Sequence, residues 1–138
     1  MGLRTCFTAV AFVVGITAPA SARPQDFNAP SSPCKTDVTT PDLVSCLDRA
    51  LQASNARLND VYKRTMQVLS PDDQQRLVRT ERAWVEYRDT ACLAERALFD
   101  GGTAAPAAEL ACREAETRAR IAALNRAYGW RVEKFGLR

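Results

Sequence analysis

The sequence predicts an all-α protein, an antiparallel three-helix bundle or helical hairpin stapled by two disulfides. Apolar residues recur every three or four positions over long segments, which is the period of a helix with one buried face. Proline and glycine clusters divide the chain into three such segments, and none shows the strict alternation of a strand. Four cysteines follow an N-terminal export signal, an even number that suits two disulfides in a small exported domain.

Residues 1–22 have the features of a cleaved signal peptide. Arg4 precedes an apolar run from about Phe7 to Ala18, and Ala20-Ser21-Ala22 forms the small-x-small pattern that signal peptidase cuts after. The run is shorter than the roughly 20 residues that span a bilayer. We therefore expect an exported protein that begins near Arg23 without a stable membrane anchor, and periplasmic and secreted locations both stay open.

Residues 23–40 should form an extended leader, because they contain three prolines and little periodicity. A helical domain is expected to follow at 41–129. For its first helix, Thr40 is a candidate N-cap, Pro41 suits the first helical position and Asp42 favours the positive helix end. The predicted apolar stripe contains Leu43, Leu47, Leu51, Ser54, Leu58, Val61, Thr65 and Leu69.

The turn "SPDD" should separate the first two helices, with Ser70 as the cap of the second and Pro71 in its first position. The "DGG" segment at 100–102 should end the second helix. A third should run from near Pro106 to Gly129, leaving 130–138 as a tail. The predicted stripe of the second helix contains Leu77, Trp84, Ala91 and Leu98, flanked by Thr80, Tyr87 and Ala94. That of the third contains Leu110, Thr117, Ile121, Leu124 and Tyr128.

The cysteines after residue 22 are Cys34, Cys46, Cys92 and Cys112. The chain has no histidine and no Cys-x-x-Cys, so we expect disulfides and no metal site. At 1.5 Å per residue, the cysteines of the first two helices lie at similar distances from the turn at Ser70, and all four thiols can meet at one end. Three connectivities are therefore open, and short loop lengths favour Cys34–Cys46 and Cys92–Cys112.

Charge and residue content disfavour several function classes. Loss of residues 1–22 removes Arg4 and no acidic residue, so the net charge falls from +3 to +2. Because the charge is nearly balanced and basic residues are interleaved with acidic ones, nucleic acid is not an expected partner. Without histidine, catalysis would need a carboxylate pair, an activated serine or a thiol. Glu81, Glu86 and Glu95 resemble solvated helix positions. We therefore expect a protein that is not an enzyme and needs no cofactor.

The segment "RAWVEYRDTAC", residues 82–92, has two interpretations. On a helix Trp84, Tyr87, Arg88 and Ala91 share one face. This face can be a core stripe, in which Arg88 lays its stem along the core and pairs with a carboxylate. It can also be a binding surface, because these residue types are enriched in interface hot spots. The helical spacing favours the core stripe.

Together with "SCLDRALQASNARLNDVYKRTMQVL" and "CREAETRARIAAL", this segment resembles the LprI-like lysozyme-inhibitor domain family of small exported bacterial proteins. The resemblance covers about Cys34 to Leu124. It implies a polar network across the bundle, mainly a scaffold, in which Asp89 accepts from Arg120 and Asn59 or Tyr62 satisfies Arg88. Besides the four cysteines, the matching positions are Leu58, Asn59, Tyr62, Trp84, Tyr87, Arg88, Asp89, Thr117, Arg120 and Leu124.

The resemblance implies a protein partner, with lysozyme as the candidate, and a role as an inhibitor of lysozyme or a related cell-wall hydrolase by steric occlusion. The candidate binding loop is Phe99, Asp100, Gly101 and Gly102, an apolar tip beside an acid, held by Cys92 and Cys112. The alternative is a non-catalytic structural or assembly module of the cell envelope that binds another exported protein. A lipid carrier is less favoured, because the apolar stripe is narrow. The oligomeric state is open.

Overall fold

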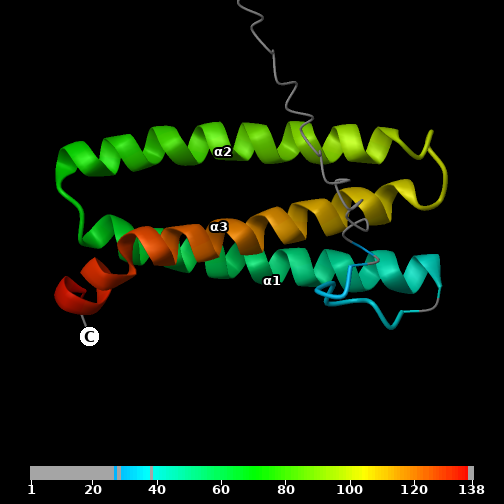
Figure 1. Ribbon diagram of the computed structural model, residues 1–138, viewed down its shortest axis with the longest axis horizontal. Coiled ribbons are helices and arrows are strands. Elements are labelled where there is room, and N and C mark those ends of the chain that lie inside the picture. Colours follow the sequence, from blue (N-terminus) through cyan, green and yellow to red (C-terminus); the bar gives the residue numbers. More distant parts are fainter. Residues whose placement is uncertain (1–26, 28, 38, 137–138) are drawn as a thin grey trace, which may run out of the picture.

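The computed structural model describes residues 27, 29–37 and 39–136, and these residues form three helices and no strand: α1 (Thr40–Gln67), α2 (Pro71–Ala97) and α3 (Ala105–Phe135). The predicted all-α fold is confirmed. Helix α3 packs on both α1 and α2, whereas α1 and α2 hardly contact each other. Figure 1 shows how α1 and α2 diverge from their short turn and how α3 runs back between them. The expected signal peptide lies outside the described residues.

The helix starts follow capping chemistry. Ser70 caps α2 as predicted: its Oγ accepts from the Asp73 amide at 3.3 Å and donates to Asp73 Oδ2 at 2.8 Å. This bond and the neighbouring Arg76 guanidinium hold the pKa of Asp73 below its usual range. The cap of α1 is Thr39, one residue before the position we expected, because Thr39 has the extended backbone that turns its Oγ1 toward the Asp42 amide.

Both disulfides have the connectivity that the loop lengths favour. Cys34–Cys46 and Cys92–Cys112 have Cα–Cα distances of 5.9 and 5.5 Å. The helical cysteines lie in the first turns of α1, the last turns of α2 and the first turns of α3, so they share the end where α2 passes to α3 (Figure 1). Residues 29–37 of the expected extended leader contain hydrogen-bonded turns, in which Ser32 and Asp37 donate to Ala29 and Cys34 carbonyls.

The end of α3 differs from the prediction. The helix passes through Gly129 and continues to Phe135, so residues 130–135 are helical and not a folded-back tail. A glycine inside a helix costs only about 1 kcal/mol relative to alanine, which the remaining backbone hydrogen bonds outweigh. The helix ends at Gly136, whose backbone is extended and whose amide donates to the Val132 carbonyl at 2.8 Å.

The core consists of two clusters. One contains Leu58 and Val61 of α1, Leu77 of α2, and Ile121 and Leu124 of α3, with Tyr62, Trp84 and Tyr128 packed against it. The other surrounds the disulfide of the leader and contains Cys34, Leu47, Ala107 and Ala111. No described helix has an apolar stretch long enough to cross a bilayer.

Helix α2 is buried far less than its predicted stripe required. Only Leu77 and Cys92 are buried on this helix, Trp84 and Ala91 are half-buried, and Leu98 is 73% exposed. The flanking positions Thr80, Tyr87 and Ala94 are exposed as well. The prediction assumed that α2 packs on α1 in a hairpin. Because α2 packs almost entirely on α3, one narrow line of its surface is covered.

Candidate functional site

Arg88 lies at the centre of the family motif, inside the interface between α2 and α3. Its side chain is 13% exposed. Nε and Nη2 each donate to Asp89 Oδ1 at 2.9 Å, and Nη1 donates to Thr117 Oγ1 at 3.4 Å. The guanidinium lies 5.0 Å from the centroid of the Trp84 ring. These contacts leave Arg88 little surface to offer a partner, whereas Tyr87, next to it, is 59% exposed.

Arg120 does not pair with Asp89, as we expected; it donates to both carboxylate oxygens of Glu81. Asp89 is approached by Arg113, with Nη1 at 3.5 Å from Oδ1. The reason is helix register. The Cys92–Cys112 disulfide places residue 92 beside residue 112, so Arg120 lies beside residue 84, one turn from Glu81 but about 7.5 Å along the axis from Asp89. Glu81, expected to be solvated, is therefore part of the interface.

Asn59 and Tyr62 do not reach Arg88, which is the second departure from the expected network. Asn59 is exposed, and Tyr62 packs against the core cluster that contains Leu58 and Val61. Both are on α1, which has almost no contact with α2. Thr117 takes the place we assigned to them, and its Oγ1 also donates to the Arg113 carbonyl at 2.7 Å. The network of the family motif therefore joins two helices instead of three.

Glu114 carries a buried charge that was not predicted from the sequence. It is 3% exposed and accepts from Ser54 Oγ of α1 at 2.9 Å and from Arg118 Nε at 2.8 and 2.9 Å. Its position was readable, because residues 114, 117, 121 and 124 step by three and four along one face. Ser54 also belongs to the predicted stripe of α1. Two polar residues on facing stripes were the signal for a hydrogen bond between the helices.

The candidate binding loop lies at the disulfide end of the molecule, between α2 and α3 (Figure 1). Asp100, Gly101 and Gly102 are exposed, and the φ angles of 47° and 73° at the first two turn the chain back toward α3. The Phe99 ring is not a free tip: it packs on Phe27 of the leader, with 6.0 Å between ring centroids. An exposed apolar side chain beside this loop is Leu98, the C-cap residue of α2.

The outer face of α2 is a second exposed surface. A shallow, mainly apolar depression follows this helix beside Tyr87, and an adjoining depression lies between α2 and Tyr62 of α1. The two depressions are lined by Ala83, Glu86, Tyr87, Thr90, Ala91 and Ala94, and by Tyr62, Val78, Glu81, Arg82, Val85 and Glu86.

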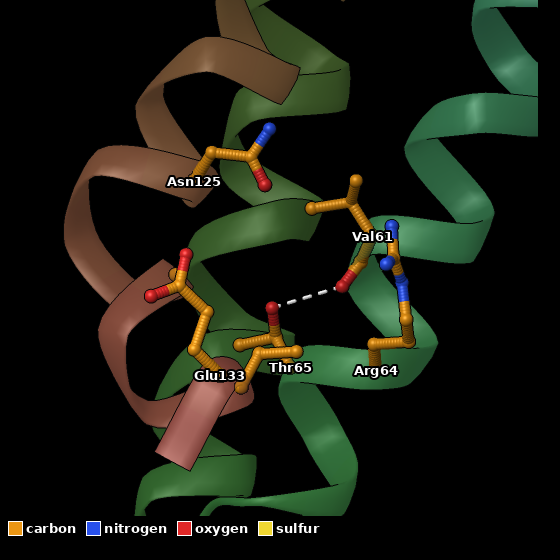
Figure 2. Close-up of a pocket in the computed structure, with 7 residues that line it drawn as sticks. Val61, Arg64, Thr65, Asn125 and Glu133 are labelled. Atoms are coloured by element: carbon orange, nitrogen blue, oxygen red, sulfur yellow. Dashed lines mark hydrogen bonds between the residues drawn. The ribbon is translucent and has the colours of Figure 1, made fainter. Parts of the chain in front are cut away.

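A small cleft of about 130 Å³ lies between α1 and the last turns of α3 (Figure 2). Gly129 opens it, since a Cβ placed on this residue would have no heavy atom within 4 Å. Arg64 of α1 stands on one side of the cleft, and Asn125 and Glu133 of α3 stand on the other. On its floor Thr65 Oγ1 donates to the Val61 carbonyl at 2.9 Å.

Four carboxylates between the helices are paired with arginines. Glu81, Asp89 and Glu114 pair with arginines, as does Glu109, which receives Arg96 at 2.9 Å and Arg113 at 3.1 Å. Cys34, Asp37 and Cys46 have ligand atoms within 4.8 Å of one another, but both sulfurs are in a disulfide and offer no thiolate to a metal. Among the described residues, this arrangement builds a cross-linked scaffold that presents the loop, the outer face of α2 and the small cleft.

Comparison with known proteins finds one family whose model matches most of this scaffold. The family described as lysozyme inhibitor LprI matches residues 31–124, which include all of α1 and α2, most of α3 and the four disulfide cysteines. An uncharacterized protein of Rhizobium meliloti (strain 1021) is 29% identical over 138 residues, which cover 89% of this chain and 94% of that protein. No solved structure matches the chain at a significant level. Because the family match spans well over half of its length, the chain belongs to the LprI lysozyme inhibitor family.

Proposed function

We propose that this protein is an exported, non-catalytic inhibitor of lysozyme or a related cell-wall hydrolase, and that it acts by steric occlusion. The observation that carries this proposal is the extent of the family match, which includes α1, α2, most of α3 and both disulfides instead of one short motif. Export is supported by the two disulfides, which persist in oxidising compartments, and by the signal-peptide pattern of residues 1–22.

The geometry suits occlusion, because an inhibitor that is rigid before binding loses little conformational entropy in the complex. The Cys92–Cys112 disulfide fixes α2 on α3, and arginine–carboxylate pairs follow the same interface on both sides of it. The exposed loop Leu98–Gly102 and the opposite end of α3 are therefore presented on a stiff body.

The test is a titration of the oxidised protein, Arg23–Arg138, into lysozyme that is clearing a cell-wall suspension, with animal-type and other lysozyme classes. We expect saturable inhibition near a one-to-one ratio with at least one class. Reduced and alkylated protein is the matched control and should lose inhibition, since its scaffold is no longer held. No inhibition of any class by protein that is helical and oxidised would contradict the proposal.

A second function, an assembly module that binds another exported envelope protein, is favoured by the outer face of α2. On this face Tyr87 is 59% exposed and lines an apolar depression. Ala94→Arg, at an exposed position on this face, should abolish capture of such a partner from an envelope extract and leave lysozyme inhibition unchanged. If the unmodified protein and Ala94→Arg capture the same proteins, this second function is wrong.

A further inference from the structure

We propose that the C-terminal end of α3 is the part of this protein that enters the substrate cleft of the hydrolase. The contact surface, here called the tip patch, consists of Trp130, Arg131, Lys134 and Phe135. This inference rests on the proposed function and specifies the surface that performs it. The tip patch lies beyond residue 124, where the family match ends, so it is suited to select among hydrolases on top of a shared scaffold.

The tip patch combines exposed aromatic rings with cations that hold them in place. Trp130 and Phe135 are 56% and 54% exposed. The Arg131 guanidinium carbon lies 5.3 Å from the Trp130 ring centroid and 5.7 Å from that of Phe135, and Lys134 Nζ lies 5.2 Å from the Phe135 centroid. Arg131 Nη2 also donates to the Val68 carbonyl at 3.3 Å, which ties the patch to the end of α1. The rings are therefore positioned before any partner arrives.

Lys134 is the exposed cation of the tip patch, whereas Arg131 is half-buried and also acts on the Asp73 carboxylate, whose pKa it helps to lower. Within residues 39–136, neither Arg131 nor Lys134 forms an ion pair with a carboxylate. The acid nearest in sequence, Glu133, lies on the side of α3 that faces the small cleft and Arg64 (Figure 2). The arginines between α2 and α3, in contrast, are already paired with carboxylates.

A hydrolase that cuts the cell-wall glycan offers the complementary surface. Glycoside hydrolases generally place two carboxyl groups on either side of the scissile bond. Cations brought into that cleft would form charge-assisted hydrogen bonds with these carboxylates, and water exclusion would strengthen them. Flat aromatic rings would occupy subsites that otherwise accept the apolar faces of sugar rings. Trp, Phe and Arg side chains at the centre of a contact are also enriched in interfaces.

The loop at the other end of the molecule is less suited to such a cleft. Its exposed acid, Asp100, would meet the two carboxylates with charge of the same sign, which is costly in a water-excluded contact. The Phe99 ring is held against Phe27 and is not available to fill a sugar subsite. Charge and ring exposure therefore both favour the α3 end over the loop.

The experiment measures inhibition and binding of an animal-type lysozyme by oxidised full-length mature protein and two sets of variants. The tip variants are Lys134→Glu, which changes one exposed residue, and Trp130→Ala with Phe135→Ser. The matched variants at the other end are Leu98→Ala and Asp100→Asn. All five positions are exposed, so circular dichroism should show the same helix content throughout. Binding is also measured with the trimer of N-acetylglucosamine present to fill the cleft.

We expect each tip variant to weaken inhibition by roughly tenfold or more, as for hot-spot residues, and the loop variants to stay within about twofold of the unmodified protein. The trimer should compete with binding. Two results would overturn the inference while the proposed function stands. One is that the loop variants lose inhibition and the tip variants keep it. The other is that the trimer leaves binding unchanged. A complete lack of inhibition by the unmodified protein would instead refute the proposed function, and the inference with it.

Discussion

Helix α3 is held to its two neighbours in different ways. Its contact with α1 is built largely from apolar and small side chains, with Leu47, Leu58 and Val61 facing a row of alanines, Ile121 and Leu124. Its contact with α2 contains one disulfide and a series of ion pairs, and α2 buries only Leu77 and Cys92. One interface is stabilised by burial, the other by a covalent bond and polar pairs.

This difference explains why α2 has a wide exposed surface in a chain of this size. Hydrophobic burial scales with the apolar area removed from water, so an interface without much apolar area needs another source of stability. The disulfide provides it by limiting the unfolded chain, and the arginine–carboxylate pairs fix the register. The outer face of α2 can then stay uncovered while the helix remains packed on α3 in the same register.

The largest effect should come from the apolar interface. Leu124→Ala removes a side chain that is 2% exposed from the cluster shared by the helices. We expect a loss of about 3 to 4 kcal/mol in the free energy of unfolding, because the substitution loses burial and leaves a cavity. Urea denaturation followed by circular dichroism measures it. Leu98→Ala, at a 73% exposed position, is the matched control and should change stability by less than about 0.5 kcal/mol.

Removal of the second disulfide should have a slightly smaller and more local effect. Cys92→Ser with Cys112→Ser opens a loop with a sequence separation of 20, which corresponds to about 3 kcal/mol in the chain-entropy model. Hydrogen exchange should show faster exchange in α2 than in α1 and α3, because α2 has few other buried contacts. Cys34→Ser with Cys46→Ser should leave exchange in α2 unchanged. Equal loss of protection in all three helices would show that the two interfaces are not separate.

The Glu81–Arg120 pair tests the polar half of the comparison. A double-mutant cycle with Glu81→Gln and Arg120→Met should give a coupling free energy of about 1 to 2 kcal/mol, because both side chains are less than one-fifth exposed. The exposed Asp60–Arg64 pair on α1, treated in the same way, should give only a few tenths of a kcal/mol. A coupling for Glu81–Arg120 no larger than for this surface pair would mean that this ion pair does not help to hold α2 on α3.

The sequence was sufficient for the fold class and the helix starts near proline, because these depend on local spacing. For the disulfides it left three connectivities open, and short loop lengths favoured the one that the structure has. The polar network was assigned wrongly for a reason that lies in register. Arg120 was paired with Asp89 on motif proximity, although the favoured Cys92–Cys112 bond already placed Arg120 beside residue 84 and near Glu81. A predicted disulfide between two antiparallel helices fixes which residues of one helix lie opposite which residues of the other. That constraint was available from the sequence.

What the sequence did not contain is which helix lies in the middle. The stripe of α2 was predicted as if it faced α1, and Tyr87 and Leu98 were placed on it; both are exposed because α3 occupies the position between the two helices. Local periodicity shows that a face is apolar but not which neighbours cover it. The same ambiguity affected Glu114. Its position on the stripe predicts that it is buried, but its partner Ser54 lies on α1, and only tertiary packing decides that α1 is the helix that covers it.

The smallest effect, and one of opposite sign, concerns the end of the α1–α3 interface. Gly129→Ala should stabilise the protein by about 0.5 to 1 kcal/mol, because alanine favours the helix and its Cβ would enter the cleft without touching a neighbour. Thermal unfolding should show a rise of a few degrees. Gly101→Ala is the contrasting variant and should destabilise, since Gly101 has a φ of 73°. If Gly129→Ala gave no gain, the apolar interface would already be complete at this end, and the cleft would not be a packing defect. If it stabilises the chain without changing inhibition, the cleft is separate in function from the tip patch, although Trp130 directly follows Gly129 on the same helix.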